Sequence, residues 1–277
     1  MAIVSRKPRN SSLRGQKFIV VDGLDKKKKP EKSLLKPSPR SGGRNSYGRI
    51  TVRHRGGGAK RKYRMVDFKR EVRDVPGVIK SFEYDPNRNV SLALVVYKNG
   101  AKRYILRPDE LKCGDEVVAG SGVEARVGNF LPIREIPAGF FIHNVELTPG
   151  KGGQLARAAG TSIQLVAKEG ERAVLRMPSS EMRTVSLDSW AAVGVLSNAE
   201  YRNIVLGKAG RTRHRGFRPS VRGMAMNPVD HPHGGGEGRS KSGSHPVTPW
   251  GKCCKGARTR KRKSSSIIRR RGGRGKN

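Results

Sequence analysis

The residues best suited to chemistry lie in one stretch near the carboxyl end of the chain, Met224–Arg239. It holds two histidines, His231 and His233, close in sequence to the carboxylates of Asp230 and Glu237. Histidine and carboxylate side chains together can ligate a metal ion or move protons in general acid–base catalysis. Gly and Pro are abundant in the same stretch, so it could instead be a loop whose backbone follows a narrow path.

Three functions compete for this loop. Metal ligands usually come from ordered elements that orient them through further hydrogen bonds, which a Gly- and Pro-rich segment does not supply. Direct catalysis would need a substrate pocket, and nothing else in the sequence indicates one. We favour a loop that threads through folded RNA, where Pro fixes the chain, Gly allows tight turns and the His rings hydrogen-bond or stack. A metal- or His-dependent enzyme centred on Asp230, His231 and Glu237 remains the alternative.

A second motif, Gly48–Arg64, carries seven Lys and Arg side chains and one His. Three consecutive glycines, Gly56–Gly58, interrupt the charges. Gly lets a backbone approach a phosphate closely, Arg forks match phosphate oxygens bidentately, and Tyr63 could stack on a base. A solvated basic loop or a nuclear-localisation signal would explain the charge but not the glycines. Neither the GxGxxG nor the GxxxxGK[ST] spacing is present, so the motif favours RNA over a nucleotide.

Charge is concentrated at the two ends of the chain. Its 277 residues include 59 Lys and Arg and 22 Asp and Glu, which gives a formal net charge of +37. Residues 1–60 hold 17 basic and 3 acidic side chains, and residues 201–277 hold 21 and 2. Such like charges repel, so a compact state needs a polyanion. The tail beyond Lys255 fits RNA, DNA or an anionic membrane by charge, but no amphipathic pattern supports the membrane. A DNA-packing protein is a further alternative.

Composition disfavours several other classes. Three cysteines are too few, and an odd number, for a secreted disulfide scaffold. Cys253 and Cys254 are adjacent and Cys113 is remote, so no CxxC spacing supports zinc and we expect free thiols. We expect no cofactor. Apolar runs are far shorter than the roughly 20 residues of a membrane span, and no signal-peptide core is evident at the N-terminus.

The middle of the chain is predicted to be β-structure. Asn99-Gly100 between apolar runs predicts a hairpin with a type I′ turn, in which both residues have positive φ. Gln154–Ala159 could form one or two helical turns. The predicted strands are Gly77–Tyr84, Val90–Tyr97, Arg103–Leu106, Phe141–Leu147, Ser162–Ala167, Ala173–Met177, Arg183–Leu187 and Trp190–Leu196.

Short strands at close spacing favour two small barrels that pack together, since neither alone would have a generous core. We expect barrels over residues 61–128 and 129–200, between basic extensions over residues 1–60 and 201–277. The extensions lack apolar material for a core, so we expect them to be ordered only against a partner. The sequence Arg-His-Arg-Gly occurs at 53–56 and again at 213–216, which chance explains in so Arg- and Gly-rich a chain.

Eight motifs spread along nearly the whole chain match one known family. They are Arg49–Gly58, Tyr84–Arg88, Lys102–Ile105, Pro149–Arg157, Gly207–Arg211, Arg218–Gly223, Met226–Arg239 and His245–Gly251. Together they resemble the universal large-subunit ribosomal protein two family (the L-two family) in its bacterial or organellar form. The last motifs are highly specific. Three positions depart from the family's common pattern: Ala59 stands in place of His, Ser180 in place of a turn Gly, and His214 in place of Trp.

The resemblance implies a mainly β chain, with an OB-fold barrel, then an SH3-like barrel, and long extended N- and C-terminal segments. It implies a non-enzymatic, structural protein of the large ribosomal subunit. This would be a primary rRNA-binding protein that supports subunit association, tRNA binding and the peptidyl-transferase region. Asp230 and His231 would be supportive near that region, and no residue is assigned as catalytic or metal-binding. The implied location is the ribosome, in the cytoplasm or an organellar matrix.

The implied partners are large-subunit rRNA, the small subunit at the intersubunit face and other ribosomal proteins, with no membrane and no small-molecule substrate. Lys and Arg from both ends should neutralise phosphates, while barrel edges and aromatic side chains set register. The residues expected to contact rRNA are Arg49, Arg53, His54, Arg55, Lys60, Arg61, Lys62, Tyr63, Arg64, Lys69, Arg70, Arg88, Lys151, Arg157, Lys208, Arg211, Arg213, Arg215, Arg218, Arg222, Asn227, His231, His233, Arg239, Trp250, Arg258 and Arg260.

Overall fold

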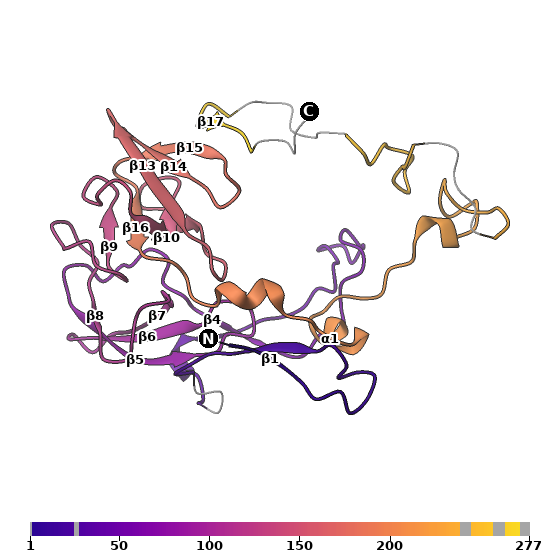
Figure 1. Cartoon of the computed structure of the whole chain (residues 1–277), viewed down its shortest axis with the longest axis horizontal. Helices are drawn as coiled ribbons and strands as arrows, with labels where there is room; N and C mark the ends of the chain where they lie inside the picture. The colour runs from indigo at the N-terminus through magenta and orange to yellow at the C-terminus, as the bar shows by residue number, and fades with distance from the viewer. Residues whose placement is uncertain (1, 25–27, 239–244, 257–263, 272–277) are drawn as a thin grey trace. The chain divides into compact units, whose positions relative to one another are not determined.

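The computed structural model describes residues 2–24, 28–238, 245–256 and 264–271 (Figure 1). The chain divides into two compact units. Unit one comprises Met1–Pro39, Lys60–Lys208 and Ser265–Asn277. Unit two comprises Arg40–Ala59 and Ala209–Ser264. Strands outnumber helices throughout the described residues, so the expectation of a mainly β chain is confirmed. No helix of the described residues is long and apolar enough to span a membrane.

The first sheet of unit one has four antiparallel strands in the order β7-β6-β5-β8. Strand β6, in the interior of the sheet, is buried on both faces, since alternate side chains belong to two separate clusters. This explains why its sequence is apolar throughout. Ala93, Val95 and Tyr97 belong to one cluster, and Leu92 and Leu94 to the other. The strands are β5 (Gly77–Glu83), β6 (Leu92–Tyr97), β7 (Lys102–Leu106) and β8 (Glu116–Val117).

The predicted hairpin between β6 and β7 is confirmed, but the predicted type I′ turn is wrong. Gly100 N–H donates to Tyr97 O at 2.9 Å, and Tyr97 N–H donates to Ala101 O at 2.9 Å. Among the turn residues only Gly100 has positive φ (+79°). The loop therefore has three residues, a turn followed by a left-handed Gly that forms a bulge. Asn99 instead accepts the Ala101 N–H on its side chain at 3.0 Å.

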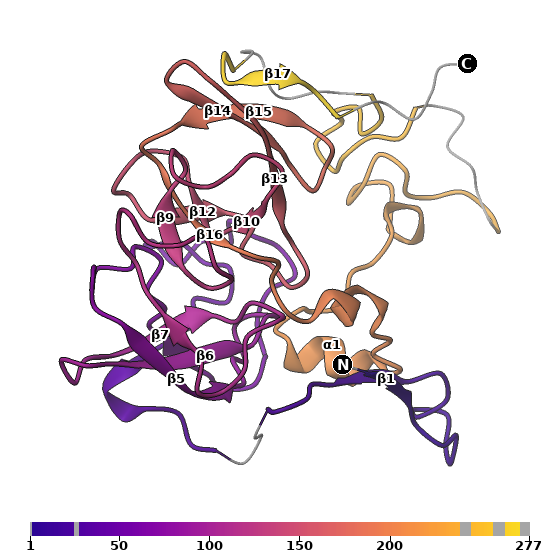
Figure 2. The same cartoon turned by 60° about the vertical axis from the view of Figure 1, so that its left-hand side comes forward.

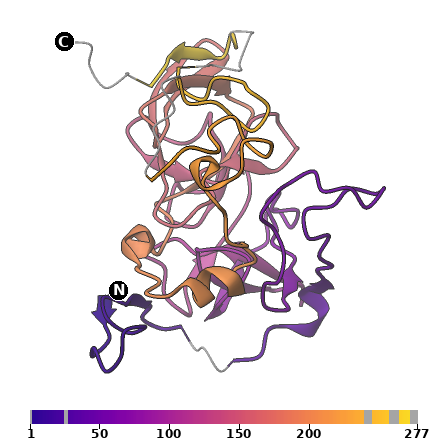
Figure 3. The ribbon, with the colours of Figure 1, turned by 90° about the vertical axis from the view of Figure 1, so that its right-hand side faces the viewer.

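The second sheet has seven strands in the order β17-β15-β14-β13-β10-β16-β9. Its core is aliphatic and includes Ile142, Ile163, Leu165, Leu175 and Ala191, each fully buried. The edge strand β17 comes from the C-terminal tail and pairs with β15, as labelled in Figures 1 and 2; it is the yellow strand in Figure 3. The strands are β9 (Phe130–Pro132), β10 (Phe141–His143), β13 (Ile163–Glu169), β14 (Arg172–Arg176), β15 (Met182–Ser186), β16 (Trp190–Val193) and β17 (Ile267–Arg269).

The two barrels pack together inside unit one, as expected. Ala119, at the end of the first barrel, pairs with Phe130 at the start of the second, and Gly120 N–H donates to Phe130 O at 3.1 Å. A buried cluster of Ala119, Phe130 and Ala192 lies at this junction, with Trp190 packed against it. Phe130 and Trp190 stack with ring centroids 5.6 Å apart. Apolar contacts and backbone pairing therefore both join the barrels.

Three two-stranded sheets and four short helices complete the described structure. The predicted helical turns at Gln154–Ala159 are wrong, because Gly153–Leu155 pairs as a strand with Val145–Glu146 and Ala156 has a left-handed φ of +48°. The remaining elements are β1 (Ala2–Ser5), β2 (Lys17–Val20), η1 (Lys32–Leu34), β3 (Leu35–Pro37), β4 (Lys62–Arg64), β11 (Val145–Glu146), β12 (Gly153–Leu155), η2 (Ala199–Asn203), α1 (Ala209–His214) and η3 (Gly223–Ala225).

The loop between β14 and β15 repeats the β6–β7 turn with a residue less suited to it. Met177 N–H donates to Glu181 O at 2.9 Å, and Ser180 N–H donates to Met177 O at 2.8 Å. Ser180 therefore takes the place that Gly100 holds in the first barrel, and its φ is +67°. A residue with a Cβ in this left-handed region is destabilised by about 1–2 kcal/mol, because the Cβ lies too close to the following carbonyl oxygen. Gly has no Cβ and is not destabilised in this way.

We expect Ser180→Gly to raise the free energy of unfolding of the chain by about 1 kcal/mol, because it relieves this strain. The reciprocal control, Gly100→Ser, places the same strain in a turn where a Cβ meets nothing within 4 Å. It should lower stability by a similar amount. Urea unfolding of both variants checks the pair, and a Ser180→Gly variant less stable than the parent would contradict this account of the turn.

Candidate nucleic-acid interface

Unit two is strongly basic, and the part of it that the structure describes has no hydrophobic core. It contains 19 Lys and Arg but only two carboxylates, Asp230 and Glu237. Among its described residues (40–59, 209–238, 245–256 and 264), His231 is the only buried one. Backbone hydrogen bonds and close approaches at Gly therefore determine its local structure, since apolar burial cannot.

Two segments far apart in the sequence pair within unit two. Gly56 N–H donates to Gly216 O at 2.9 Å, Ala59 N–H to His214 O at 2.9 Å, and Arg218 N–H to His54 O at 3.0 Å. The two Arg-His-Arg-Gly sequences, whose likeness chance was expected to explain, thus lie against each other. The basic segments 54–59 and 214–218 therefore form one paired structure.

Glycine is required where these segments meet. A Cβ on Gly58 would lie 2.9 Å from both Cα and N of Gly216, closer than side-chain atoms come to backbone. Gly58 O also accepts a hydrogen bond from the Arg40 guanidinium. At Gly43 (φ +81°) a Cβ would lie 2.2 Å from Val52 O, and Gly43 O accepts the Thr51 N–H at 2.9 Å. Small residues thus let the backbone fold tightly between arginines.

This pairing surrounds a hollow of about 730 Å³ lined by five arginines and His54. No carboxylate is among the lining residues. Guanidinium groups gathered without a counter-charge repel one another, and two oxygens of a phosphate group can accept a bidentate pair of hydrogen bonds from a guanidinium group. The hollow is suited to anionic groups. Its lining residues are Arg40, Ser41, Gly42, Arg44, Ile50, Val52, Arg53, His54, Arg55, Gly56, Gly57 and Arg218.

Contacts within unit two hold some of these side chains in place. The Arg55 guanidinium carbon lies 4.3 Å from the centroid of the Phe217 ring, a cation–π contact. His54 Nδ1 lies 3.1 Å from Pro219 O, so that ring nitrogen donates the hydrogen bond. Arg213 Nη1 donates to Phe217 O at 3.1 Å. These contacts orient the Arg55 and His54 side chains within the folded form of unit two.

The His231 loop is built around the one buried ring of unit two. His231 is 8% exposed, and a Cβ on Gly223 would lie 2.5 Å from its ring, so the ring packs directly on that glycine. His231 Nδ1 accepts the His233 N–H at 3.0 Å. His231 O accepts the Gly234 N–H at 2.8 Å. The geometry makes His231 the packing centre of its loop.

The alternative of a metal-dependent enzyme finds no support in this geometry. His233 Nε2 accepts the Val247 N–H at 3.1 Å, so in both histidines a ring nitrogen that could ligate a metal is engaged by the backbone. Within the described residues no three His, Cys, Asp or Glu side chains gather as metal ligands would. The pKa of His143 is lowered to about 4 by burial, but this ring lies in the second barrel with Nδ1 2.9 Å from Gly194 O.

The first barrel holds another group of the predicted residues. Arg88 pairs with Asp85, and its guanidinium lies 5.3 Å from the Tyr63 ring centroid and donates to Tyr63 Oη at 3.1 Å. Arg61 Nη1 donates to Pro86 O at 2.7 Å. Tyr63 is 37% exposed, so part of its ring is open for stacking.

The loop around Lys151 is shaped by a buried carboxylate. Glu146 accepts the N–H of Gly150 at 3.0 Å, of Gly152 at 2.7 Å and of Trp190 at 3.2 Å. These bonds hold the glycine-rich loop in a fixed form that leaves Lys151 exposed. Near it Arg157 is exposed, and its guanidinium lies 4.6 Å from the centroid of the Phe68 ring.

One predicted contact residue is buried. Arg70 is 3% exposed and donates from Nη2 to Gly128 O at 3.2 Å, so its guanidinium group is engaged inside the first barrel. Arg40 and Arg44, which line the hollow, were not predicted. The run of Ser and Gly at 41–43 between them is the signal that could have indicated them.

The other predicted residues are partly or fully exposed, except for three outside the described residues. Those three are Arg239, Arg258 and Arg260. Partly exposed are Arg64, Arg211, Arg213 and His233. Exposed are Arg49, Arg53, His54, Arg55, Lys60, Lys62, Lys69, Lys208, Arg215, Arg218, Arg222, Asn227, Asp230 and Trp250.

Comparison with protein families agrees with this arrangement. The model of the RNA binding N-terminal domain of Ribosomal Proteins L2 matches residues 31–119, and the model of the C-terminal domain of Ribosomal Proteins L2 matches residues 126–251. The first match covers the first barrel and the Arg40–Ala59 segment, and the second covers the second barrel and much of the rest of unit two. The chain therefore belongs to the ribosomal protein L2 family and is a structural, rRNA-binding protein of the large ribosomal subunit.

Proposed function

We propose that unit two supplies the principal rRNA contacts of this protein, with the arginine-lined hollow as their centre. The observation that carries this proposal is the gathering of five arginines and His54 around a hollow without a carboxylate. The polyanion available to a ribosomal protein is the backbone of rRNA. Guanidinium groups bind its phosphates through paired hydrogen bonds. Phosphate contacts here position the protein rather than select a base sequence.

The two barrels, over residues 61–128 and 129–200, serve in this proposal as a rigid support with further contacts at their edges. Tyr63 offers an aromatic face for a base, while Lys151 and Arg157 stand on loops that the barrels fix. In this proposal the basic extensions over residues 1–60 and 201–277 supply most of the remaining Lys and Arg side chains. The proposed interface comprises the residues predicted from the sequence, without Arg70 and with Arg40 and Arg44 added.

The His231 loop has a supporting role in this proposal, not a catalytic one. Its ring is buried, its Nδ1 accepts the His233 N–H, and no three His, Cys, Asp or Glu side chains gather as metal ligands would within the described residues. We infer that the loop supports the peptidyl-transferase region, tRNA binding and joining to the small subunit by holding rRNA in shape. The protein acts in ribosomes of the cytoplasm or of an organellar matrix, together with other ribosomal proteins.

Removing charge from the hollow should weaken rRNA binding in a salt-dependent way. We expect Arg44→Gln with Arg218→Gln to lower affinity for large-subunit rRNA more than tenfold at low salt. The slope of log K against log salt should become shallower by about 1–2, because about one counterion is released per phosphate contact. Filter binding across a salt series measures both quantities.

The control for this test removes equal charge from exposed sites on the first barrel, as Lys98→Gln with Lys112→Gln. The control should lose much less affinity and keep nearly the parent slope. Equal losses in the two double variants would contradict a central role for the hollow, and a parent protein whose binding does not depend on salt would contradict the proposed function.

Substitution of His231 should impair assembly more than peptide-bond formation. His231→Ala removes the ring that fills the space against Gly223, so we expect fewer large subunits and fewer joined ribosomes. Asp230→Asn, at an exposed neighbouring position, is the matched control and should leave assembly near normal. Sedimentation profiles beside single-turnover peptide transfer decide the matter. Normal profiles with a collapsed chemical rate would overturn the supporting role.

A further inference from the structure

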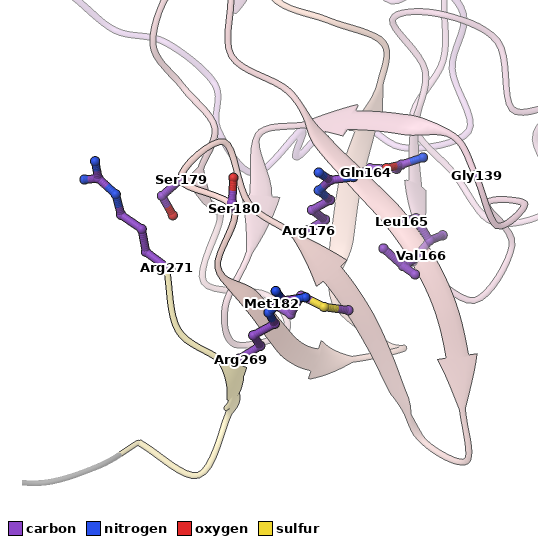
Figure 4. A pocket seen from close by; sticks show the side chains of 10 residues that line it. All are labelled: Gly139, Gln164, Leu165, Val166, Arg176, Ser179, Ser180, Met182, Arg269 and Arg271. Atoms are coloured by element: carbon purple, nitrogen blue, oxygen red, sulfur yellow. The ribbon is translucent and has the colours of Figure 1, made fainter. Parts of the chain in front are cut away.

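A second basic hollow lies on the second barrel, away from any residue predicted from the sequence. It measures about 630 Å³ and is lined partly by the barrel and partly by the C-terminal tail (Figure 4). The tail residues, Arg269 on β17 and Arg271 just after it, lie beyond both family matches, which end at residue 251. The lining residues are Gly139, Gln164, Leu165, Val166, Arg176, Ser179, Ser180, Met182, Arg269 and Arg271.

Strand register determines which of these side chains share a face. Gln164 is directly opposite Arg176, Arg176 is opposite Met182, and Met182 is opposite Arg269. Directly opposed residues of antiparallel strands point to the same face of the sheet. The four side chains thus form one row across β13, β14, β15 and β17, and Figure 4 shows Arg269 beside Met182.

The groups around this hollow are donors with no negative counter-charge. Arg176, Arg269 and Arg271 are all exposed, and within the described part of the chain none has a carboxylate or hydrogen-bond partner for its guanidinium group. The hydroxyls of Ser179 and Ser180 add further donors at the rim. No Asp or Glu lines the hollow. This set of donors suits the oxygens of a phosphate.

The tail supplies two of the three guanidinium groups, so the site exists only while β17 is docked. The docking is slight: the strand has three residues, Met182 pairs with Arg269 and Arg183 with Ile267, and Thr184 N–H donates to Ser266 O at 2.8 Å. Ile268 is 57% exposed and adds little burial. So short a strand is marginal on its own, and a ligand that binds only the docked form stabilises that form.

We propose that β17 and the β14–β15 edge form a composite site for a backbone phosphate of large-subunit rRNA, and that binding of this phosphate and docking of the tail strand stabilise each other. The inference rests on the rRNA-binding function and adds a site outside unit two. The second unit-two segment, Ala209–Ser264, ends just before β17. A phosphate bound at this site would therefore hold the chain against the barrel at the point where it returns to unit one.

The test uses the full chain and deproteinised large-subunit rRNA. Hydrogen exchange is followed at the Thr184 amide, whose acceptor is the tail carbonyl of Ser266. In the parent protein, rRNA should slow exchange at Thr184 by about tenfold or more, because the ligand favours the docked strand. In Arg176→Gln this slowing should be lost, although rRNA still protects residues 40–59. The barrel amide of Leu187, which donates to Glu171 O at 3.0 Å, reports that the fold is intact.

Affinity gives a second readout with a matched control. Arg176→Gln and Arg269→Gln should each weaken rRNA binding by about fivefold, and the double variant should lose little more, because both contact one phosphate. Arg172→Gln changes the same charge on the same strand outside the hollow, and its effect should add to that of Arg269→Gln.

The outcomes separate this inference from the proposed function. The composite site would be overturned if rRNA did not change the exchange rate of the Thr184 amide. It would also be overturned if the losses of binding affinity in Arg176→Gln and Arg269→Gln were additive. Either result would leave rRNA binding itself standing. A parent protein that fails to bind rRNA at all would overturn both.

Discussion

Electrostatic repulsion within a coreless unit is the constraint on which the rest of this structure depends. Unit two carries 19 Lys and Arg against two carboxylates and, over its described residues, buries one side chain. Hydrophobic burial is the dominant favourable contribution to folding, and it is nearly missing here. Neutralisation by phosphate can replace it, because each arginine then gains a charged hydrogen-bond partner instead of a like-charged neighbour.

Unit one supplies what unit two lacks. Its clusters of Ile, Leu and Val are buried within two barrels that share a junction at Phe130. The chain leaves unit one after β3 and returns at β4, and these two strands pair, so the first excursion begins and ends at one fixed place. The second excursion ends at β17, which pairs with β15. Strand pairing in unit one thus fixes both ends of the first excursion and the C-terminal end of the second.

Local patterns in the sequence predicted the barrels well, since strand periodicity and turn residues act over a few positions. The hairpin around Gly100 and the central strand β6 follow from such patterns, whereas the turn type depended on the φ of Asn99, which the dipeptide does not determine. Pairing of the two Arg-His-Arg-Gly sequences was missed because no local pattern indicates contact across 160 positions. Burial of Arg70 was missed for the same reason: its acceptor, Gly128 O, is distant in sequence. Strand β17 gave no signal because three residues show no periodicity.

The most direct test of the account is amide hydrogen exchange along the whole chain, with and without large-subunit rRNA. In the free protein the barrel amides should be protected, while those of Gly56 and Ala59, whose acceptors lie on the distant segment, should exchange almost as fast as in an unfolded chain. Binding of rRNA should protect both. Strong protection of these amides in protein free of nucleic acid would contradict the claim that the polyanion holds unit two together.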